Sequence, residues 1–279
     1  MKKKRIIIIG AGGFISTEIE KELKNKFSVI PVLRKKINFL NVQSAKKLVQ
    51  LLRPNDTIIF IASKAPVKNN KMFIDNMLMA TNFIKLYSHF NFKQFIYISS
   101  DAVYSDKKII KENSQTLPNS LHGLMHLMRE RLFTQFLKIP VTILRITLVY
   151  GENDPHNSYG PNSFFRLAKN RKIISLYGKG EEKRDHIHVL DVAKFIRIVV
   201  EKNKKGIINV ATGFVYSFNQ IAKIIIKITN NKKTKIKLVK RKFPMPHLGY
   251  RSFNIKKLRQ MNFKPSKFPQ VAKLIFEKY

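Results

Sequence analysis

Apolar runs of strand length alternate with amphipathic stretches of helical length along most of the chain. The apolar runs are nearly continuous, which is typical of strands buried on both faces of a parallel sheet. Strands that alternate with helices in this way predict an α/β fold with helices on both faces of the sheet. The predicted strands are Arg5–Ile9, Ser28–Leu33, Thr57–Ala62, Gln94–Ser99, Val141–Ile146 and Gly206–Val210, and the predicted helices are Thr17–Asn25, Ser44–Leu52, Lys71–His89, Ser120–Leu137, Asn162–Asn170, Val189–Glu201 and Ser217–Thr229.

A glycine-rich turn, Gly10–Ser16, lies between the first predicted strand and the first predicted helix. Glycines permit φ > 0 and let the backbone touch a ligand. The amides and the positive end of the following helix form a seat for a phosphate. The sequence therefore predicts a phosphate-bearing cofactor and a Rossmann-like doubly wound parallel sheet, whose ligands bind beyond the carboxyl ends of the strands.

After about residue 150 the alternation of strands and helices loosens. Gly151–Pro161 and Phe243–Gly249 contain prolines and glycines and are predicted to be loops. We expect residues 1–160 to form the Rossmann domain, with 186–215 returning to it. Residues 161–185 and 216–279 are expected to form a smaller C-terminal lobe that closes over the cleft.

The charge of the chain is strongly positive: 54 lysines and arginines against 17 acidic residues give +37, while cysteine is absent. Disulfides and thiolate chemistry are therefore excluded. The basic residues are scattered rather than arranged in a stripe with aromatics, so nucleic acid is not the expected partner. No apolar run approaches the roughly 20 residues of a membrane span, and glycines interrupt the apolar start, so we expect a cytoplasmic protein without a signal peptide.

Five motifs in order along the chain resemble the extended short-chain dehydrogenases/reductases, in particular the NAD(P)-dependent nucleotide-sugar epimerases and dehydratases. The resemblance covers nearly the whole length. Ser16 replaces the last glycine of the GxxGxxG turn, and Asn254 replaces an aspartate in the last motif. The matching segments are Gly10–Ser16, Ile98–Tyr104, Leu144–Gly151, Tyr177–Ala193 and Arg251–Leu258.

The resemblance implies that the coenzyme is NAD or NADP. NAD selectivity usually rests on an acidic residue at the end of the second strand. Here that strand ends in Leu33 and is followed by Arg34, Lys35 and Lys36, which favour the 2′-phosphate of NADP(H). Asn38 stands where the family often has an aspartate that contacts adenine. The expected coenzyme contacts are Gly10, Gly13, Phe14, Ile15, Arg34, Lys35, Asn38, Ala62, Ser63, Ser99 and Thr147.

The predicted active site departs from the family at two positions. The resemblance implies a Tyr and a Lys four residues later on one helix, and this chain has His122 and His126 there, while Ser100 is retained. The i, i+4 spacing places both histidines on one face of the helix, and imidazole titrates near neutrality. His122 is therefore the candidate proton donor or acceptor, and His126 assists it. A neutral His126 does not replace the permanent cation of the lysine. A His–His metal pair is disfavoured because no carboxylate is in evidence nearby.

Two functions remain open at this point. The first is a nucleotide-sugar epimerase, dehydratase or reductase that acts by hydride transfer at a sugar carbon, with Ser100, His122 and His126 at the site. The second is a catalytically impaired homologue that binds a dinucleotide or a sugar nucleotide in a sensing or structural role. By resemblance, Arg184 and Arg251 contact the diphosphate of a nucleotide-sugar substrate, and the protein is a homodimer.

Overall fold

The computed structural model of the protein describes residues 3–157, 159–230 and 233–276. The chain divides into two compact units, of which the first contains residues 1–105, 112–146 and 192–210. The second contains residues 106–111, 147–191 and 211–279. Residues 147–160, expected in the Rossmann domain, belong to the second unit, and the returning segment is 192–210 rather than 186–215. Local composition did not reveal this boundary because β7, at 148–150, pairs with β9 of the second unit.

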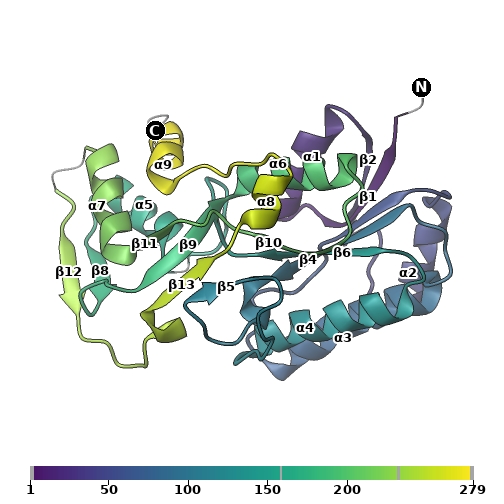
Figure 1. The fold of residues 1–279 in the computed structure, drawn as a ribbon, viewed down its shortest axis with the longest axis horizontal. Coiled ribbons are helices and arrows are strands. Elements are labelled where there is room, and N and C mark those ends of the chain that lie inside the picture. The colour runs from purple at the N-terminus through teal and green to yellow at the C-terminus, as the bar shows by residue number, and fades with distance from the viewer. Residues whose placement is uncertain (1–2, 158, 231–232, 277–279) are drawn as a thin grey trace. The chain divides into compact units, whose positions relative to one another are not determined.

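The first unit contains a six-stranded sheet in which every neighbouring pair is parallel, so the predicted fold class is confirmed (Figure 1). The strand order is β10-β6-β4-β3-β1-β2. The direction of strand succession reverses between β1 and β3, and a doubly wound sheet binds its ligands at such a point. The strands are β1 (Arg5–Ala11), β2 (Ser28–Leu33), β3 (Thr57–Phe60), β4 (Gln94–Ser100), β6 (Val141–Ile146) and β10 (Gly206–Val210).

Helices cover both faces of this sheet, with α1 and α6 on one face and α3 and α4 on the other (Figure 1). Asn69 and Ser120 cap α3 and α4 by accepting hydrogen bonds from backbone amides of the first turn. Phe83 of α3 and Phe133 of α4 pack on Phe60 and Phe95 of the sheet, at ring separations of 4.8 to 5.3 Å. The helices and 3₁₀ turns are α1 (Phe14–Lys24), α2 (Val42–Lys46), η1 (Lys47–Gln50), α3 (Asn70–Tyr87), η2 (Asp101–Val103), α4 (Leu121–Phe136) and α6 (Val189–Glu201).

The predicted elements differ from the observed ones mainly at their ends. Helix α1 begins at Phe14 rather than Thr17, because Gly13 already adopts the extended conformation of an N-cap residue. The predicted helix Ser44–Leu52 is divided into α2 and η1. None of the described helices is long and apolar enough to cross a membrane.

The second unit contains a sheet of order β11-β9-β13-β5, a strand β7 that pairs with β9, and a two-stranded sheet of β12 and β8. Its core gathers Phe164, Phe218, Ile221 and Phe268 from three helices. The predicted loop Phe243–Gly249 is partly wrong, because its last four residues form the 3₁₀ turn η3. The elements are β5 (Ile109–Ile110), β7 (Leu148–Tyr150), α5 (Pro161–Lys169), β8 (Ile174–Tyr177), β9 (Lys183–His188), β11 (Val215–Ser217), α7 (Phe218–Ile228), β12 (Ile236–Val239), η3 (Pro246–Gly249), β13 (Tyr250–Phe253), α8 (Lys256–Gln260) and α9 (Phe268–Phe276).

The ends of β1 and β3 approach each other closely at Gly10. The carbonyl of Ile9 accepts hydrogen bonds from the amides of Ile61 and Ala62, each at 2.9 Å. Gly10 has φ of 95°, and a Cβ atom there would lie 2.4 Å from both Cα and N of Ala62. Both the backbone conformation and the close contact with Ala62 therefore require glycine at this position.

Replacing Gly10 with alanine is expected to lower the free energy of unfolding by about 2–4 kcal/mol, because backbone strain and a clash with Ala62 add together. Gly206 is the matched control, because it has φ of 86° and no atom within 4 Å of a built Cβ. Gly206→Ala should cost about 1–2 kcal/mol, from strain alone. Urea unfolding of both variants measures the difference, and equal losses would contradict the close contact.

Candidate active site

The glycine turn, the predicted phosphate site, lies at the point where the strand order reverses. Gly12 and Gly13 are exposed and carry no side chain, so the first amides of α1 are open to a ligand. Ser16, in the place of the third glycine, is buried. Its hydroxyl accepts a hydrogen bond from the Gly13 amide at 2.8 Å and donates one to the Gly13 carbonyl at 3.0 Å. The serine therefore holds the turn from its buried side and leaves the exposed side of the turn uncovered.

The segment after β2 is basic and exposed. Arg34, Lys35 and Lys36 all lie on the surface, and no acidic residue occurs between Arg34 and Asn38. The side-chain oxygen of Asn38 accepts a hydrogen bond from the Leu40 amide at 3.1 Å. Its amide group therefore remains as a donor, and the cations remain available to an anionic group.

The ends of β3 and β4 supply the other expected coenzyme contacts. Ala62 is half-buried and Ser63 is exposed. The hydroxyl of Ser99 is buried and donates to Glu130 at 2.5 Å, so it already has a partner inside the protein. Thr147 belongs to the second unit, where its hydroxyl donates to the Asp185 carbonyl at 3.1 Å. The first unit thus contains all the predicted coenzyme contacts except Thr147.

The start of helix α4 lies against η2, directly after Ser100. A Cβ atom on Gly123 would lie 2.1 Å from the carbonyl oxygen of Ala102, so only glycine permits this approach. His122 is half-buried, and its ring centroid is 4.7 Å from that of His126 in an edge-to-face arrangement. The structure therefore brings Ser100, His122 and His126 to one edge of the sheet.

Both histidines are held in the neutral form. Nδ1 of buried His126 lies 2.7 Å from the hydroxyl of Tyr97. Burial lowers the pKa of His126 well below its ordinary value; the charge of Arg129, and that of His122 when it is protonated, lower it further. Burial also lowers the pKa of His122, while the carboxylate of Asp101 opposes this shift. Both shifts favour the neutral imidazole. The described residues contain no group of three or more His, Cys, Asp or Glu that could hold a metal ion.

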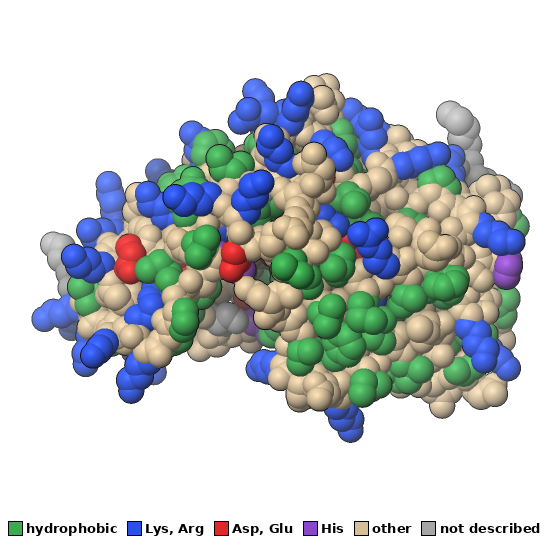
Figure 2. All heavy atoms as spheres, turned by 60° about the horizontal axis from the view of Figure 1, so that its bottom comes forward, with side chains coloured by type: hydrophobic (Ala, Val, Ile, Leu, Met, Phe, Trp, Pro, Cys, Tyr) green, Lys and Arg blue, Asp and Glu red, His purple; other side chains and the backbone are tan. Residues whose placement is uncertain are grey.

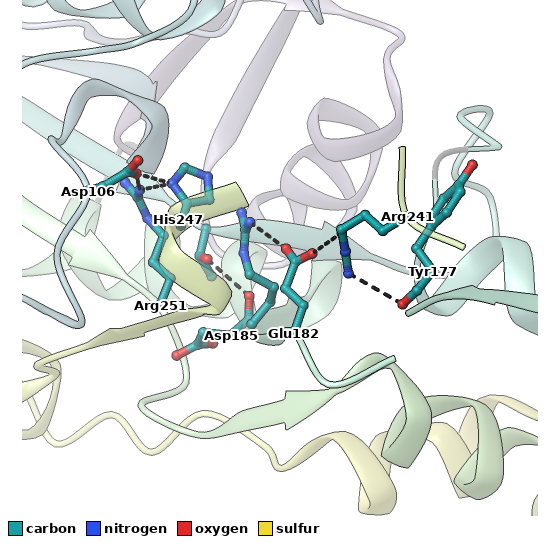
Figure 3. A network of polar contacts seen from close by, with 9 residues as sticks. Asp106, Tyr177, Glu182, Asp185, Arg241, His247 and Arg251 are labelled. Carbon is teal, nitrogen blue, oxygen red and sulfur yellow. Dashed lines mark hydrogen bonds and ion pairs between the residues drawn. The ribbon is translucent and has the colours of Figure 1, made fainter. Parts of the chain in front are cut away.

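A second polar cluster lies in the second unit and includes Glu182, Arg241 and Arg251 (Figure 3). Arg184 of β9 is the register partner of Arg251 of β13. Arg184 Nη1 is 3.1 Å from Glu182 Oε1, and Arg241 Nη1 is 3.6 Å from Glu182 Oε2. Arg251 Nη1 is 3.4 Å from Asp106 Oδ1. Three guanidinium groups thus face two carboxylates, an arrangement that suits an anionic ligand.

Sequence reasoning singled out only two members of this cluster. Arg241, Glu182 and Asp106 were missed, and so was His247, whose Nδ1 lies 2.5 Å from Asp106 Oδ1. Arg241 is one of many basic residues in a lysine-rich segment, and nothing local distinguishes it. The loop Asp106–Lys111 joins the second unit because β5 pairs with β13 and Asp106 contacts Arg251 and His247, contacts that no local pattern indicates.

Comparisons with known proteins agree with this architecture. Residues 6–211 match the NAD dependent epimerase/dehydratase family. The dTDP-D-glucose 4,6-dehydratase of Dictyostelium discoideum is 26% identical over 273 residues, which cover 81% of this chain and 62% of the relative. A putative UDP-glucose 4-epimerase of Methanocaldococcus jannaschii is 29% identical over 248 residues, which cover 79% of this chain and 81% of the relative. The chain therefore spans less than two thirds of the Dictyostelium protein.

A solved structure has the same fold. It is the UDP-N-acetylglucosamine 4-epimerase from Methanobrevibacter ruminantium M1 in complex with UDP-N-acetylmuramic acid, with a TM-score of 0.84 and 23% identity, covering 99% of this chain and 98% of that one. The fold and the glycine turn define a protein of the extended short-chain dehydrogenase/reductase class. Within that class, the chain belongs to the NAD dependent epimerase/dehydratase family, which confirms the predicted resemblance.

The buried histidine in β9 predicts a pH dependence of stability. Burial, with a contribution from Arg184, lowers the pKa of His186 from 6.5 to about 3. Between these values the unfolded chain binds a proton that the folded chain does not, so the free energy of unfolding falls as pH falls. His186 should account for a loss of about 2 kcal/mol between pH 6.5 and pH 5.

Chemical denaturation at a series of pH values checks this expectation. His186→Phe should flatten the dependence between pH 5 and pH 6.5 by about that 2 kcal/mol. His89 is exposed, and His89→Gln should leave the dependence as it is in the wild type. A His186→Phe variant with the wild-type slope would contradict the prediction.

Proposed function

We propose that the protein is an NAD(P)-dependent nucleotide-sugar epimerase, dehydratase or reductase that transfers hydride at a sugar carbon. The observation that carries the proposal is the juxtaposition within one unit of the phosphate seat after β1 and the Ser100–His122–His126 group after β4. The bound coenzyme would supply hydride exchange at this edge of the sheet. The turn from Gly10 to Ile15 would hold its pyrophosphate.

The residues at the start of α4 would handle the proton. His122 is neutral and half-buried beside η2, so it can take a proton from a sugar hydroxyl and return it to a carbonyl oxygen. The hydroxyl of Ser100 would bind the same oxygen. His126 would act as a positioning residue, because its hydrogen bond to Tyr97 fixes its ring beside His122.

The basic end of β2 supports NADP(H) over NAD(H). Arg34 and Lys35 are exposed, and an arginine pairs with a phosphate through two parallel hydrogen bonds. The family is named for NAD, so this selectivity rests on the composition of the β2 end alone.

A nucleotide sugar is the substrate class that the second unit supports. Arg184 and Arg251 are adjacent on paired strands, and guanidinium recognises a diphosphate better than ammonium does. Relatives and solved neighbours named for UDP- and dTDP-sugars support the same class.

The alternative is a homologue that binds without turnover. The observation that favours it is the burial of His126, which is held by Tyr97 and kept neutral, so the cation that a lysine would place there is absent from position 126.

Helices α3 and α4 also support a homodimer. Apolar side chains gather over this part of the molecule in Figure 2. They include Ile74, which is 62% exposed, and Phe136, which is 52% exposed, together with Leu78, Leu124 and Met128. Because each copy carries a net charge of +37, two copies repel least at a face with few charges. A second copy of the chain is the occupant that fits this face, through a two-fold contact.

Titration of the reduced coenzymes and incubation with a panel of sugar nucleotides test the enzymatic proposal. NADPH should bind more tightly than NADH, and Arg34→Gln should remove the difference. The absence of tryptophan makes coenzyme fluorescence easy to follow. His122→Ala should retain coenzyme binding and lose about 10²–10⁴-fold in kcat, because it removes the general acid–base group.

His89→Ala is the control for the loss of a histidine, because His89 is exposed and follows α3. This variant should turn over substrate at the wild-type rate. Coenzyme binding without turnover on any sugar nucleotide would favour the binding homologue. Absence of binding of both coenzymes at micromolar concentration would refute both functions.

Sedimentation equilibrium tests the dimer. The wild type should sediment with twice the mass of one chain at micromolar concentration, and Leu124→Arg should sediment as a monomer, because it places two like charges in the two-fold contact. Leu248→Arg is the control, since Leu248 is 71% exposed but lies in the second unit. A monomeric wild type would overturn this assignment.

A further inference from the structure

Helix α4 carries a completely buried arginine that has no acidic partner. Arg129 is 0% exposed, and no carboxylate among the described residues pairs with it. Its Nη2 donates to the Ala62 carbonyl at 2.8 Å, and its Nη1 lies 3.5 Å from Oδ1 of Asn76. Its Nε has no hydrogen-bond partner. A buried cation without a counter-ion is unfavourable for folding, so its presence calls for another reason.

The surroundings of Arg129 only partly offset this cost. The guanidinium carbon lies 4.9 Å from the ring centroid of Phe60, 5.2 Å from that of Tyr97 and 5.9 Å from that of Phe133. Aromatic faces attract a cation, but more weakly than a carboxylate does.

The buried charges next to Arg129, those of Glu130 and Arg145, neutralise each other. Glu130 receives two hydrogen bonds from Arg145, at 3.0 and 2.6 Å, and one from Ser99. That pair is neutral as a whole, so the interior of α4 retains one net positive charge, which belongs to Arg129.

Arg129 connects the two halves of the proposed site. Its hydrogen bond to Ala62 reaches the strand end that lies against Gly10 of the coenzyme turn. Its guanidinium also lies beside Tyr97, whose hydroxyl is 2.7 Å from Nδ1 of His126. His126 occupies the place where the resemblance implies a lysine, so α4 lacks a cation at that position and has one three residues further on.

We propose that Arg129 supplies the fixed positive charge of the acid–base site, as a positioning residue that acts through Tyr97 and His126. This inference rests on the proposed function. A cation beside Tyr97 strengthens its hydroxyl as a donor, so Tyr97 donates to Nδ1 of His126 and the ring proton of His126 stays on Nε2. The same charge opposes a second cation on His126. His122 then faces one neutral tautomer rather than a mixture of states.

The groups that face this pair come from several elements. Tyr97 of β4, with His122 and Arg129 of α4, acts on His126. Asp101 of η2 acts on His122. Glu130 acts on Tyr97 and is neutralised by Arg145 of β6.

Nitrogen-15 NMR of the histidine rings, together with steady-state kinetics, tests the proposal in the full chain. In the wild type and in Arg129→Lys, His126 should remain the neutral Nε2–H tautomer from pH 5 to pH 8. In Arg129→Met, His126 should show a raised pKa and a second tautomer. That variant should also lose at least tenfold in kcat, with KM and the coenzyme Kd within about threefold of the wild type.

The matched control is Arg131→Met, which removes an exposed charge from the same helix and should change neither the spectrum nor the rate. Thermal melting adds a readout of structure: Arg129→Met should melt no lower than Arg129→Lys, because it removes an unpaired buried charge, whereas a structural cation would require the opposite order.

Several results would overturn the inference. They are a wild-type His126 that titrates near pH 6.5 or occupies the other tautomer, and an Arg129→Met variant whose His126 matches the wild type. If Arg129→Met does not fold, the wild-type and Arg129→Lys spectra still decide. Because the spectra need neither coenzyme nor substrate, a protein without turnover would refute the proposed function while leaving this measurement readable.

Discussion

The contact between the backbones of Gly10 and Ala62 is the constraint on which the candidate site depends. It lies where β1 and β3 run side by side and the succession of strands reverses. Gly10 has no Cβ atom, so the turn can lie directly against the end of β3. The amides of the turn then face the edge of the sheet where β3 ends. Arg129 of α4 donates to the carbonyl of the same Ala62, so the contact also connects α4 to the turn. One close approach of two strands therefore links the predicted coenzyme turn to the helix that carries His122 and His126.

Helix α4 combines two kinds of buried charge, which have different consequences. Glu130 and Arg145 form a bidentate pair that is closed on itself and holds the helix on β6. Removing one partner of such a pair strongly destabilises the fold, whereas the intact pair contributes little net charge to its surroundings. Arg129, one residue earlier, has no such partner, so its field extends to Tyr97 and His126. On the same helix, Glu130 thus has a structural role and its neighbour Arg129 has an electrostatic one.

The limits of prediction from the sequence follow the range of the interactions involved. Strands Ser28–Leu33 and Val141–Ile146 could be predicted to the residue, because mainly apolar runs of strand length need no long-range information. The short strands of the second unit could not, because they form by pairing with distant segments: β5 pairs with β13 across more than 140 residues, and β13 also pairs with β9. The histidine pair was visible from a motif in register, whereas the burial of Arg129 depends on three rings that come from β3, β4 and α4.

In the proposed site, two histidines and Arg129 stand where the resemblance implies a Tyr–Lys pair, and the resting charge is the same. A neutral phenol with a lysine carries one positive charge, and two neutral imidazoles with Arg129 carry one as well. The chemistry of the proton carrier changes, however. A phenol must be brought down in pKa by its cation before it can accept a proton. Burial lowers the pKa of His122 below its ordinary value without any cation. In the proposed site, Arg129 is therefore not needed to deprotonate the base, and it lies deeper, where it orders His126 instead.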